Sequence, residues 1–530
     1  MGSARASTIR ARWMLAAVAF VLVAAFPYFE RLHNANERPR LLQGMAWIEG
    51  EGAAIDGPAT RHIDPGIDVS TTVDGRLVPN KPPGTTVPAA AAYALLRATA
   101  SAEHPPSLRR YTWLARLLGA WLPTIVLVLL AWRRHRGLLG PSLAASAVAL
   151  YALATPAATY AHVLFGHSLA ALCLWWGLVT LVDAGVTDPH ASFDRQRAVA
   201  CSLGGASLAA AIVVEYQSAF AVLPVAILML LELRTAAGRR RALAAASGAL
   251  PLLAALATYH AVLFGSPLST GYHHVVDPGF AAKHAVGFLG LHRPSWTALY
   301  EHLVSPWGGL LYWAPILVLA AVGVAPLLRA LEPRLRREVV LMLCSFATLL
   351  LVNLSLAQTG GWRVGPRYLV SAFPLLILPL GLCLREHGHR PLLTCAWVAA
   401  ITWSVSTNTL AANLFPHLVP EGSPVGDILV PLWRRGLEPW SIVHLVGLQR
   451  GGLWLVGLVT AAVSVAALHA FVGPDRRCRV AALAGISLGC LALLATALTS
   501  PSSSLAEQDL AAIAGIWEPT SRPAPSRPLW

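Results

Sequence analysis

Long apolar stretches recur along the whole chain, separated by polar connections of very different lengths. A helix needs roughly 20 apolar residues to cross the hydrocarbon core of a bilayer, and these stretches have about that length. They do not alternate polar and apolar residues, which excludes a membrane β-barrel. The pattern predicts about thirteen membrane-spanning helices, near residues 13–29, 113–132, 140–158, 162–182, 198–214, 218–233, 242–264, 307–328, 338–357, 367–384, 391–411, 453–472 and 480–499.

Clusters of arginine between the apolar stretches orient the predicted bundle. Short cytoplasmic loops carry an excess of Lys and Arg. With the N-terminus in the cytoplasm, every arginine cluster in a short loop falls on the cytoplasmic side, including those at 133–136, 234–241 and 334–337. The first span, 13–29, follows three arginines but lacks a convincing small-residue cleavage site, so we predict that it is a retained signal anchor.

The apolar run 85–100 does not fit this threading, because a span there would move all later arginine clusters to the outside. We predict that it is a re-entrant or interfacial helix. The long loops then lie outside, where functional residues are expected. We expect one integral membrane domain over residues 1–500, with extracytoplasmic loops at 30–112, 265–306 and 412–452, and an outer Pro/Ser-rich tail at 501–530.

Composition supports the membrane assignment and limits the partners. Hydrophobic residues make up 56% of the 530 residues and charged residues 12%, and the mean hydropathy is +0.58. All but two of the 40 Lys and Arg residues are arginine, mostly in short clusters between spans, so the net charge of +14 reflects topology and not nucleic-acid binding. The seven cysteines fall in predicted helices or at their cytoplasmic ends, which argues against disulfides. We predict an all-α polytopic protein of the cell inner membrane, in contact with membrane lipid.

The first outer loop alternates acidic and basic groups just above the membrane. Glu37 follows the first span closely, and Asp68 and Lys81 come later in the loop. A carboxylate can take the proton of an acceptor hydroxyl while a lysine or arginine neutralises charge on a leaving phosphate. Because phosphate leaves as a stable anion, the second carboxylate of a glycoside hydrolase is not needed. We predict Glu37, or else Asp68, as the catalytic base, and Lys81 as a ligand of the donor phosphate.

Further ionisable groups stand at the outer ends of predicted spans. Such groups are costly near the membrane unless satisfied, and they often mark function. We predict that His167 and Glu215 pair in the substrate pocket, with a buried pair that only holds helices together as the alternative. Arg363 and Arg367 flank a Gly-rich turn, and arginine binds phosphate bidentately. We predict that both bind the donor phosphate, with interfacial anchoring as the alternative.

The second large outer loop gathers four histidines and an aspartate. Their spacing matches no recognised metal-ligand pattern. We therefore assign no cofactor and no metal ligands, and a divalent metal remains an open alternative. The residues are His273, His274, Asp277, His284 and His292.

Several short motifs together resemble one enzyme family. The most specific runs from Asp68 through Asp74-Gly75-Arg76 to Lys81-Pro82-Pro83-Gly84; others lie at 160–167, 214–216, 305–315 and 360–368. On these motifs the chain resembles the bacterial GT-C glycosyltransferases, akin to the protein mannosyltransferases and the aminoarabinose transferase of lipid A. Many relatives have Asp where this chain has Asn36, so the usual Asp-Glu pair is reduced to Glu37.

The resemblance implies a GT-C-like helical bundle with an extracytoplasmic active site. It implies an inverting transfer of a sugar from a polyprenyl-phosphate donor to a hydroxyl of a glycan, lipid or protein acceptor, with Tyr160 and Tyr368 in the substrate pocket. The alternatives are a transporter or flippase of a lipid-linked or small anionic substrate, and a scaffold protein of the envelope. The hydrophobic pattern shows no repeat between the halves of the chain, which a transporter tends to have.

Overall fold

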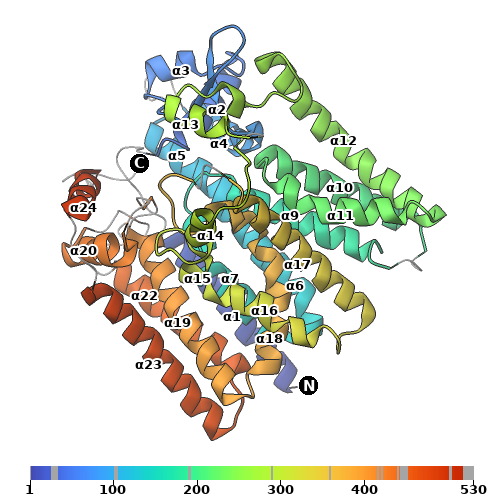
Figure 1. Cartoon of the computed structure of the whole chain (residues 1–530), viewed down its shortest axis with the longest axis vertical. Helices are drawn as coiled ribbons and strands as arrows, with labels where there is room; N and C mark the ends of the chain where they lie inside the picture. Colours follow the sequence, from blue (N-terminus) through green and yellow to red (C-terminus); the bar gives the residue numbers. More distant parts are fainter. Residues whose placement is uncertain are drawn as a thin grey trace.

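The computed structural model describes residues 2–24, 34–100, 106–188, 192–287, 290–356, 360–414, 417–418, 422–437, 441, 452–499 and 504–516 (Figure 1). The loop predicted at 412–452 and the tail predicted at 501–530 are therefore only partly described. The predicted end of the first span, 25–29, lies outside the described residues.

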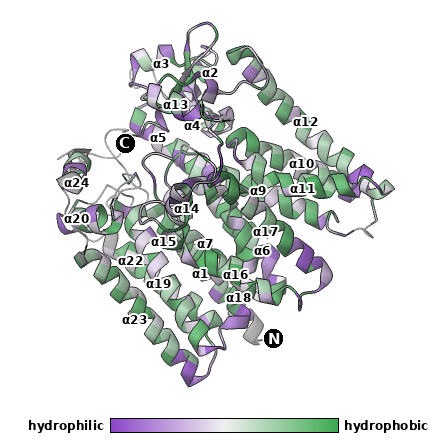
Figure 2. Ribbon diagram, viewed as in Figure 1, coloured by the Kyte–Doolittle hydropathy of each residue, from purple (hydrophilic) through white to green (hydrophobic). Residues whose placement is uncertain are grey.

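A bundle of apolar helices forms most of the structure. Figure 2 shows that these helices are largely hydrophobic, whereas polar residues gather in a layer at one end of the bundle. The bundle consists of α1 (Gly2–Ala24), α5 (Leu108–Arg116), η2 (Leu117–Trp121), α6 (Leu122–Leu139), α7 (Pro141–Leu153), α8 (Ala157–Tyr160), α9 (His167–Asp183), α10 (Arg195–Val214), α11 (Ser218–Glu232), α12 (Ala236–Phe264), α15 (Leu310–Trp313), α16 (Pro315–Gly323), η4 (Ala325–Leu327), α17 (Pro333–Asn353), η5 (Arg367–Leu376), α18 (Ile377–His387), α19 (Pro391–Leu414), α22 (Gly452–Phe471) and α23 (Arg476–Thr499).

The all-α membrane fold predicted from the sequence is confirmed. Every predicted span has a helix at its place, and seven helical stretches of the described chain are long and apolar enough to cross a membrane. Four more apolar helices are shorter, so the number of thirteen spans remains a prediction. The seven long stretches are Arg5–Ala24, Leu108–Leu139, Arg195–Val214, Ala236–Phe264, Arg367–His387, Trp454–Phe471 and Arg476–Leu498; the shorter ones are Pro141–Leu153, His167–Asp183, Ser218–Glu232 and Pro315–Leu327.

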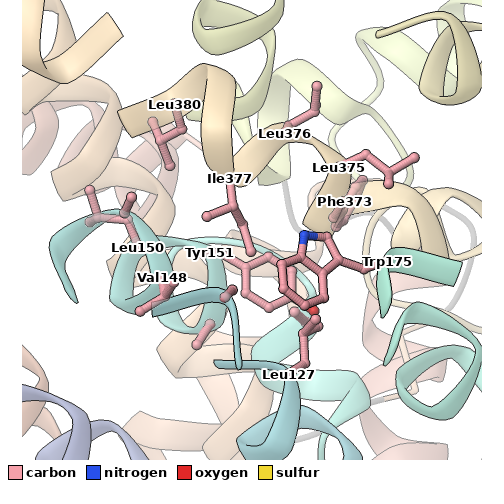
Figure 3. Close-up of a cluster of buried hydrophobic side chains, with 14 of the residues drawn as sticks. Leu127, Val148, Leu150, Tyr151, Trp175, Phe373, Leu375, Leu376, Ile377 and Leu380 are labelled. Atoms are coloured by element: carbon pink, nitrogen blue, oxygen red, sulfur yellow. The ribbon is translucent and has the colours of Figure 1, made fainter. Parts of the chain in front are cut away.

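The helices of the bundle differ in how deeply their side chains are buried. Figure 3 shows the core where α6, α7, α9 and η5 meet, with Tyr151 and Trp175 fully buried among leucines. On the outer helices α12 and α23, by contrast, leucines such as Leu243 and Leu483 are more than half exposed. Lipid tails are as apolar as leucine, so such surfaces suit a bilayer and not water.

A small polar layer covers one end of the bundle. Its first part packs α2 (Arg38–Glu49) against α4 (Thr86–Ala98), which in turn packs on α5. The run 85–100 thus forms a short helix of this layer, and it is not among the candidate spans of the described chain. The remaining elements outside the bundle are α3 (Asp56–Arg61), β1 (Val69–Thr71), β2 (Leu77–Pro79), η1 (Pro83–Thr85), η3 (Gly271–His274), α13 (Pro278–His284), α14 (Trp296–Leu303), η6 (Pro424–Leu429), α20 (Val430–Arg434) and α24 (Ser504–Ile516).

A tight β-hairpin is the feature of this layer that matters most for the site. Strands β1 and β2 pair antiparallel, with Val69 opposite Pro79 and Thr71 opposite Leu77. The connecting turn contains Gly75 with φ of +82°, a left-handed conformation that favours glycine. The Asp74-Gly75-Arg76 motif is therefore the tip of the hairpin, and the residues that flank the strands are brought side by side.

Candidate functional site

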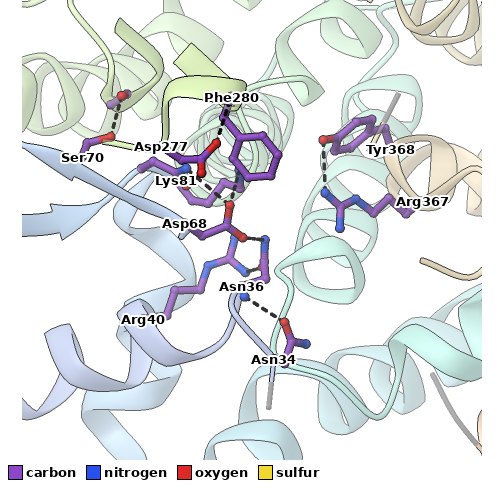
Figure 4. A network of polar contacts seen from close by, with 12 residues as sticks. Asn34, Asn36, Arg40, Asp68, Ser70, Lys81, Asp277, Phe280, Arg367 and Tyr368 are labelled. Carbon is purple, nitrogen blue, oxygen red and sulfur yellow. Dashed lines mark hydrogen bonds and ion pairs between the residues drawn. The ribbon is translucent and has the colours of Figure 1, made fainter. Parts of the chain in front are cut away.

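The hairpin brings Asp68 and Lys81 together. Asp68 precedes β1 and Lys81 follows β2, and the N–H of Asn80 donates to the C=O of Asp68 at 3.1 Å, which extends the ladder by one pair. Lys81 Nζ lies 3.8 Å from Asp68 Oδ1 (Figure 4). Both side chains are largely buried. Two residues that are distant in the sequence motif thus form one charged pair.

Amide side chains hold the Asp68 carboxylate in place. Asn36 Nδ2 donates to Asp68 Oδ2 at 3.1 Å and Asn80 Nδ2 donates to Oδ1 at 3.4 Å. Burial alone would raise the pKa of Asp68, but Lys81, Arg367 and other positive neighbours outweigh it and hold the pKa below its usual value. Asp68 is therefore an ionised, oriented carboxylate. An Asp in place of Asn36 would set two carboxylates against each other here.

Asp68 and Lys81 line a cavity of about 450 Å³. This volume lies in the range of pockets that hold small organic ligands. Its wall combines several polar groups with aromatic and aliphatic side chains. The described lining residues are Asn34, Ala35, Asn36, Ile67, Asp68, Lys81, Phe165, Phe280, His284, Gly361, Trp362, Arg367, Tyr368 and His417.

Arg367 and Tyr368 enter the cavity from the other side, at the start of η5. Arg367 Nη2 donates to Tyr368 Oη at 3.2 Å (Figure 4). The turn before them requires Gly365, because its φ is +61° and a Cβ there would lie 2.8 Å from Pro156 and 3.2 Å from Trp313. The Gly-Pro-Arg-Tyr motif is thus a packed turn that aims a guanidinium at the cavity. Arg367 and Tyr368 thus both line the cavity, and their predicted roles toward the substrate remain predictions.

An aromatic residue that the sequence did not single out completes the lysine site. Lys81 Nζ lies 4.9 Å from the ring centre of Tyr272 in η3, and η3 is tied to the hairpin by Ser70 Oγ, which donates to the C=O of Gly271 at 2.6 Å. Burial would lower the pKa of Lys81, but the raising effects of Tyr272 and Asp68 outweigh it, so the pKa lies above its usual value. Lys81 is therefore a cation that remains available to an anionic ligand.

Glu37, the first choice for the base from the sequence, lies elsewhere. It is fully buried and is not among the described residues that line the cavity. Arg116 Nε and Nη2 donate to its two oxygens at 2.8 and 2.6 Å, and the N–H of Leu164 donates to Oε1 at 2.7 Å. Burial would raise the pKa of Glu37, but Arg116 lowers it below its usual value. Both oxygens of Glu37 are therefore occupied by buried donors, and Glu37 as the base remains a prediction.

The predicted pair of His167 and Glu215 exists, with Arg40 as a third member. His167 Nδ1 and Arg40 Nη2 each lie 3.6 Å from Glu215 Oε1. Arg40 also donates to the C=O of Leu164 at 3.0 Å and to Asn36 Oδ1. Asn36 therefore links this cluster to Asp68. No sequence signal pointed to Arg40, since it lies in an ordinary amphipathic stretch.

This Arg40 cluster lies behind the cavity wall. His167 and Glu215 are not among the described lining residues, and neither is Tyr160. Tyr160 Oη donates to the C=O of Val364 at 3.1 Å, and its ring lies 5.0 Å from that of His167. Of the four residues predicted for the substrate pocket, Tyr368 lines the cavity, whereas His167, Glu215 and Tyr160 are not among its described lining residues.

Glu215 gives a testable pH dependence. Burial raises the pKa of its carboxyl from 4.5 to about 7, although Arg40, Lys81 and Arg367 act in the opposite direction. Because the folded protein binds more protons between these two values, its stability should fall as the pH rises from about 4.5 to about 7. We expect Glu215→Gln to lack this dependence, so the variant should gain apparent melting temperature relative to the wild type between about pH 5 and 7. A parallel pH dependence of the two proteins would contradict the assignment.

Arg363, the other predicted ligand of the donor phosphate, is buried and does not line the cavity within the described chain. Its guanidinium lies 4.1 Å from the ring centre of Trp307. The described residues contain no group of three or more His, Cys, Asp or Glu side chains that could hold a metal ion. Two of the outer histidines stack on aromatic rings instead, His274 on Phe264 and His284 on Tyr272.

Comparison with known proteins gives similarities only among solved structures. No protein-family model and no curated protein matches the chain. The chain is similar to ArnT from Cupriavidus metallidurans bound to undecaprenyl phosphate, with 15% identity over 91% of this chain and 78% of that chain and a TM-score of 0.47. For the apo state of that protein the identity is 16%, the coverage 90% and 77%, and the TM-score 0.46.

A third similar structure is the archaeal oligosaccharyltransferase AglB from Archaeoglobus fulgidus in complex with an inhibitory peptide and a dolichol-phosphate. The identity is 12%, and the match covers 88% of this chain and 56% of that chain at a TM-score of 0.38.

Proposed function

We propose that the protein is an inverting glycosyltransferase that moves a sugar from a polyprenyl-phosphate donor to an acceptor hydroxyl at the outer face of the membrane. The observation that carries this proposal is that an ionised carboxylate, Asp68, shares one cavity with two cations, Lys81 and Arg367. A base and a phosphate site are the two elements that such a transfer needs. The motif resemblance supports the same reaction.

The position of the arginines supports the outer side of the membrane. Helix α9 begins at His167, beside the residues that support the cavity, and ends at Asp183. At this far end of α9, Asp183 pairs with Arg134 of α6. Arg134 also pairs with Glu338 of α17. Arg134 belongs to the first cluster assigned to the cytoplasm by charge. We therefore place the cavity on the extracytoplasmic side.

In the proposed complex, the donor phosphate lies between Lys81 and Arg367 and the lipid tail lies among the helices. The sugar occupies the cavity, whose aromatic side chains Phe165, Phe280 and Trp362 offer apolar surface to a sugar ring. Tyr368, held by Arg367, adds a hydroxyl at the same wall. Fixed cations near the phosphate stabilise the charge that develops as it leaves.

The chemical step needs one base and no acid. Asp68 accepts the proton of the acceptor hydroxyl, whose oxygen forms a bond with the anomeric carbon. The bond between that carbon and the phosphate oxygen breaks at the opposite face, and its electron pair stays on the phosphate. Polyprenyl phosphate leaves as an anion paired with Lys81 and Arg367, and the configuration at the anomeric carbon is inverted.

Donor binding would improve Asp68 as a base. Lys81 is the strongest of the neighbours that lower the pKa of Asp68 against the effect of burial. A phosphate that pairs with Lys81 weakens this effect and adds negative charge nearby, and both changes raise the pKa of the carboxylate. Proton removal is therefore promoted only when the donor is in place.

A test of the donor site uses the two lysines of the chain. We expect Lys81→Gln to raise the KM for a labelled polyprenyl-phosphate sugar in membranes by about 10- to 100-fold, because one charge-assisted contact to the phosphate is lost. Lys283, the other lysine, is exposed on α13 and does not line the cavity in the described chain. Lys283→Gln should therefore keep the wild-type KM. Equal KM values for all three proteins would exclude Lys81 from the donor site.

The transporter alternative keeps one supporting observation. The buried cluster of Arg40, His167 and Glu215 contains groups that could carry a proton or an anion. The same membranes distinguish the two functions. Movement of the labelled lipid across sealed vesicles without any transfer of label to an acceptor would favour transport.

A further inference from the structure

The guanidinium of Arg363 is a buried cation without a hydrogen-bonding partner among the described residues. Its side chain is 1% exposed, and within the described chain none of the nitrogens Nε, Nη1 and Nη2 has a partner. The ring of Trp307 covers one face of the guanidinium at 4.1 Å, while the backbone N–H of Arg363 donates to the C=O of Leu418 at 2.8 Å. A buried charge in this state is strongly unfavourable unless an anion joins it.

The guanidinium of Arg363 lies close to that of Arg367. A Cβ placed on Gly360 would lie 2.8 Å from Arg363 Nη1 and 3.1 Å from Arg367 Nε. Both nitrogens are therefore close to the same point above Gly360, and neither has a hydrogen-bonding partner among the described residues. Gly360 has φ of +97°, and on the other side of Arg363 a Cβ on Gly308 would clash with Nη2. A side chain at either glycine would therefore displace the Arg363 guanidinium, and we call the two guanidinium groups with these two glycines the cradle.

The charges around the cradle lack an anion. Burial, and then the nearby charge of Arg367, lower the pKa of Arg363 to about 9. Glu301 interacts favourably with Arg363 at longer range, but no ion pair or hydrogen bond joins the two side chains, and Glu301 Oε2 is itself buried without a partner in the described chain. His302 is buried beside them with both ring nitrogens unpartnered among the described residues.

We propose that Arg363 and Arg367 form a second phosphoryl-binding subsite above Gly360, next to the donor phosphate site at Lys81. Guanidinium groups bind phosphoryl oxygens with paired, charge-assisted hydrogen bonds, which matches the free donors of this cradle. Gly361 and Arg367 line the cavity, so the cradle adjoins the cavity wall. The inference rests on the proposed function, since Arg367 is shared between the two sites.

The phosphoryl group that binds the second subsite can come from either of two molecules, because guanidinium groups would bind both in the same way. It is either the second phosphate of a lipid diphosphate donor or a phosphate carried by the acceptor. Binding experiments with detergent-purified protein distinguish them, using polyprenyl monophosphate, polyprenyl diphosphate and inorganic phosphate as probes. The variants are Arg363→Met, which keeps an apolar side chain on Trp307 but removes the charge, and Lys81→Gln.

For a diphosphate donor, we expect the wild type to bind the diphosphate at least about tenfold more tightly than the monophosphate, and Arg363→Met to bind both alike. For a phosphorylated acceptor, we expect equal affinity for the two lipids. Inorganic phosphate should then raise the melting temperature of the monophosphate-loaded wild type but not of Arg363→Met. If Arg363→Met behaves like the wild type with all three probes, the proposal is overturned.

Two controls separate this result from misfolding and from the donor site. Arg363→Met should melt at a higher temperature than the wild type when no ligand is bound, because an unpaired buried charge is removed. Glu301→Gln should melt close to the wild type; a large loss of stability would mean that Glu301 already pairs with Arg363, and would overturn the proposal. Lys81→Gln should weaken binding of the polyprenyl monophosphate both in the wild type and in Arg363→Met. If it does not, the proposed donor site at Lys81 is wrong, whereas the comparison of Arg363→Met with the wild type still tests the second subsite.

Discussion

Asp68→Asn is expected to lower kcat for sugar transfer by about 10²- to 10⁴-fold, the range that a positioned general base contributes. The amide has the size of the carboxylate but cannot take the acceptor proton. The variant also releases Lys81 from its ion pair, so the KM for the donor should not rise. Initial rates with a labelled polyprenyl-phosphate sugar, measured over a range of donor concentrations, separate the two constants.

The control for Asp68 lies in the same hairpin. Asp74 is exposed at the tip, where Arg76 Nε donates to Oδ2 at 2.6 Å. Asp74→Asn should therefore transfer at the wild-type rate. Because Asp68→Asn leaves Lys81 without its carboxylate partner, its rate should be expressed per folded molecule, which excludes unfolding as the cause. Wild-type transfer by Asp68→Asn would remove Asp68 from the mechanism.

The relation of Asp68 to Lys81 shows what a local motif can predict. Their spacing belongs to the sequence motif that runs from Asp68 to Lys81. In the structure, this motif forms two short strands joined by a glycine turn. Hairpin register depends on residues near in sequence, so the pairing is encoded locally. The opposite wall is not encoded in that way. Arg367 and Tyr272 come from other outer segments, and only packing determines that Tyr272 contacts Lys81 and that Arg367 lines the same cavity.

The position of Glu37 could not be predicted from the sequence for the same reason. Its partners Arg116 and Leu164 are 79 and 127 residues away. A carboxylate a few residues after a first span can face a substrate or a buried arginine, and local pattern does not distinguish these outcomes. Arg116 lies in a stretch whose hydropathy predicts a plain membrane span, which hides a buried cation at its outer end.

Hydropathy located the helices well because it depends on local composition. It did not show which helices form the core and which meet lipid. The stretch Arg367–His387 is almost entirely buried, whereas only a small part of Ala236–Phe264 is buried, although their hydropathies are similar. Buried helices and lipid-facing helices need the same apolar residues, so the distinction arises only in the assembled bundle.

Glu37→Gln is expected to destabilise the folded protein by about 3–5 kcal/mol, the loss found when one partner of a buried ion pair is removed. Arg116 would keep its charge in a fully buried position without the carboxylate that neutralises it. The expected readouts are a lower yield of folded protein from membranes and a large drop in the apparent melting temperature. Any loss of transfer should follow the loss of folded protein.

The double variant Glu37→Gln with Arg116→Met distinguishes this structural role from catalysis. It removes both charges, and the side-chain amide that replaces the carboxylate still offers an oxygen to the N–H of Leu164. Replacement of both members of a buried ion pair is often neutral or stabilising, so much of the lost stability should return. Because Asp68 remains intact, we expect the double variant to transfer sugar at a rate per folded molecule close to that of the wild type. A folded double variant without transfer, beside an active Asp68→Asn, would assign the base to Glu37 after all.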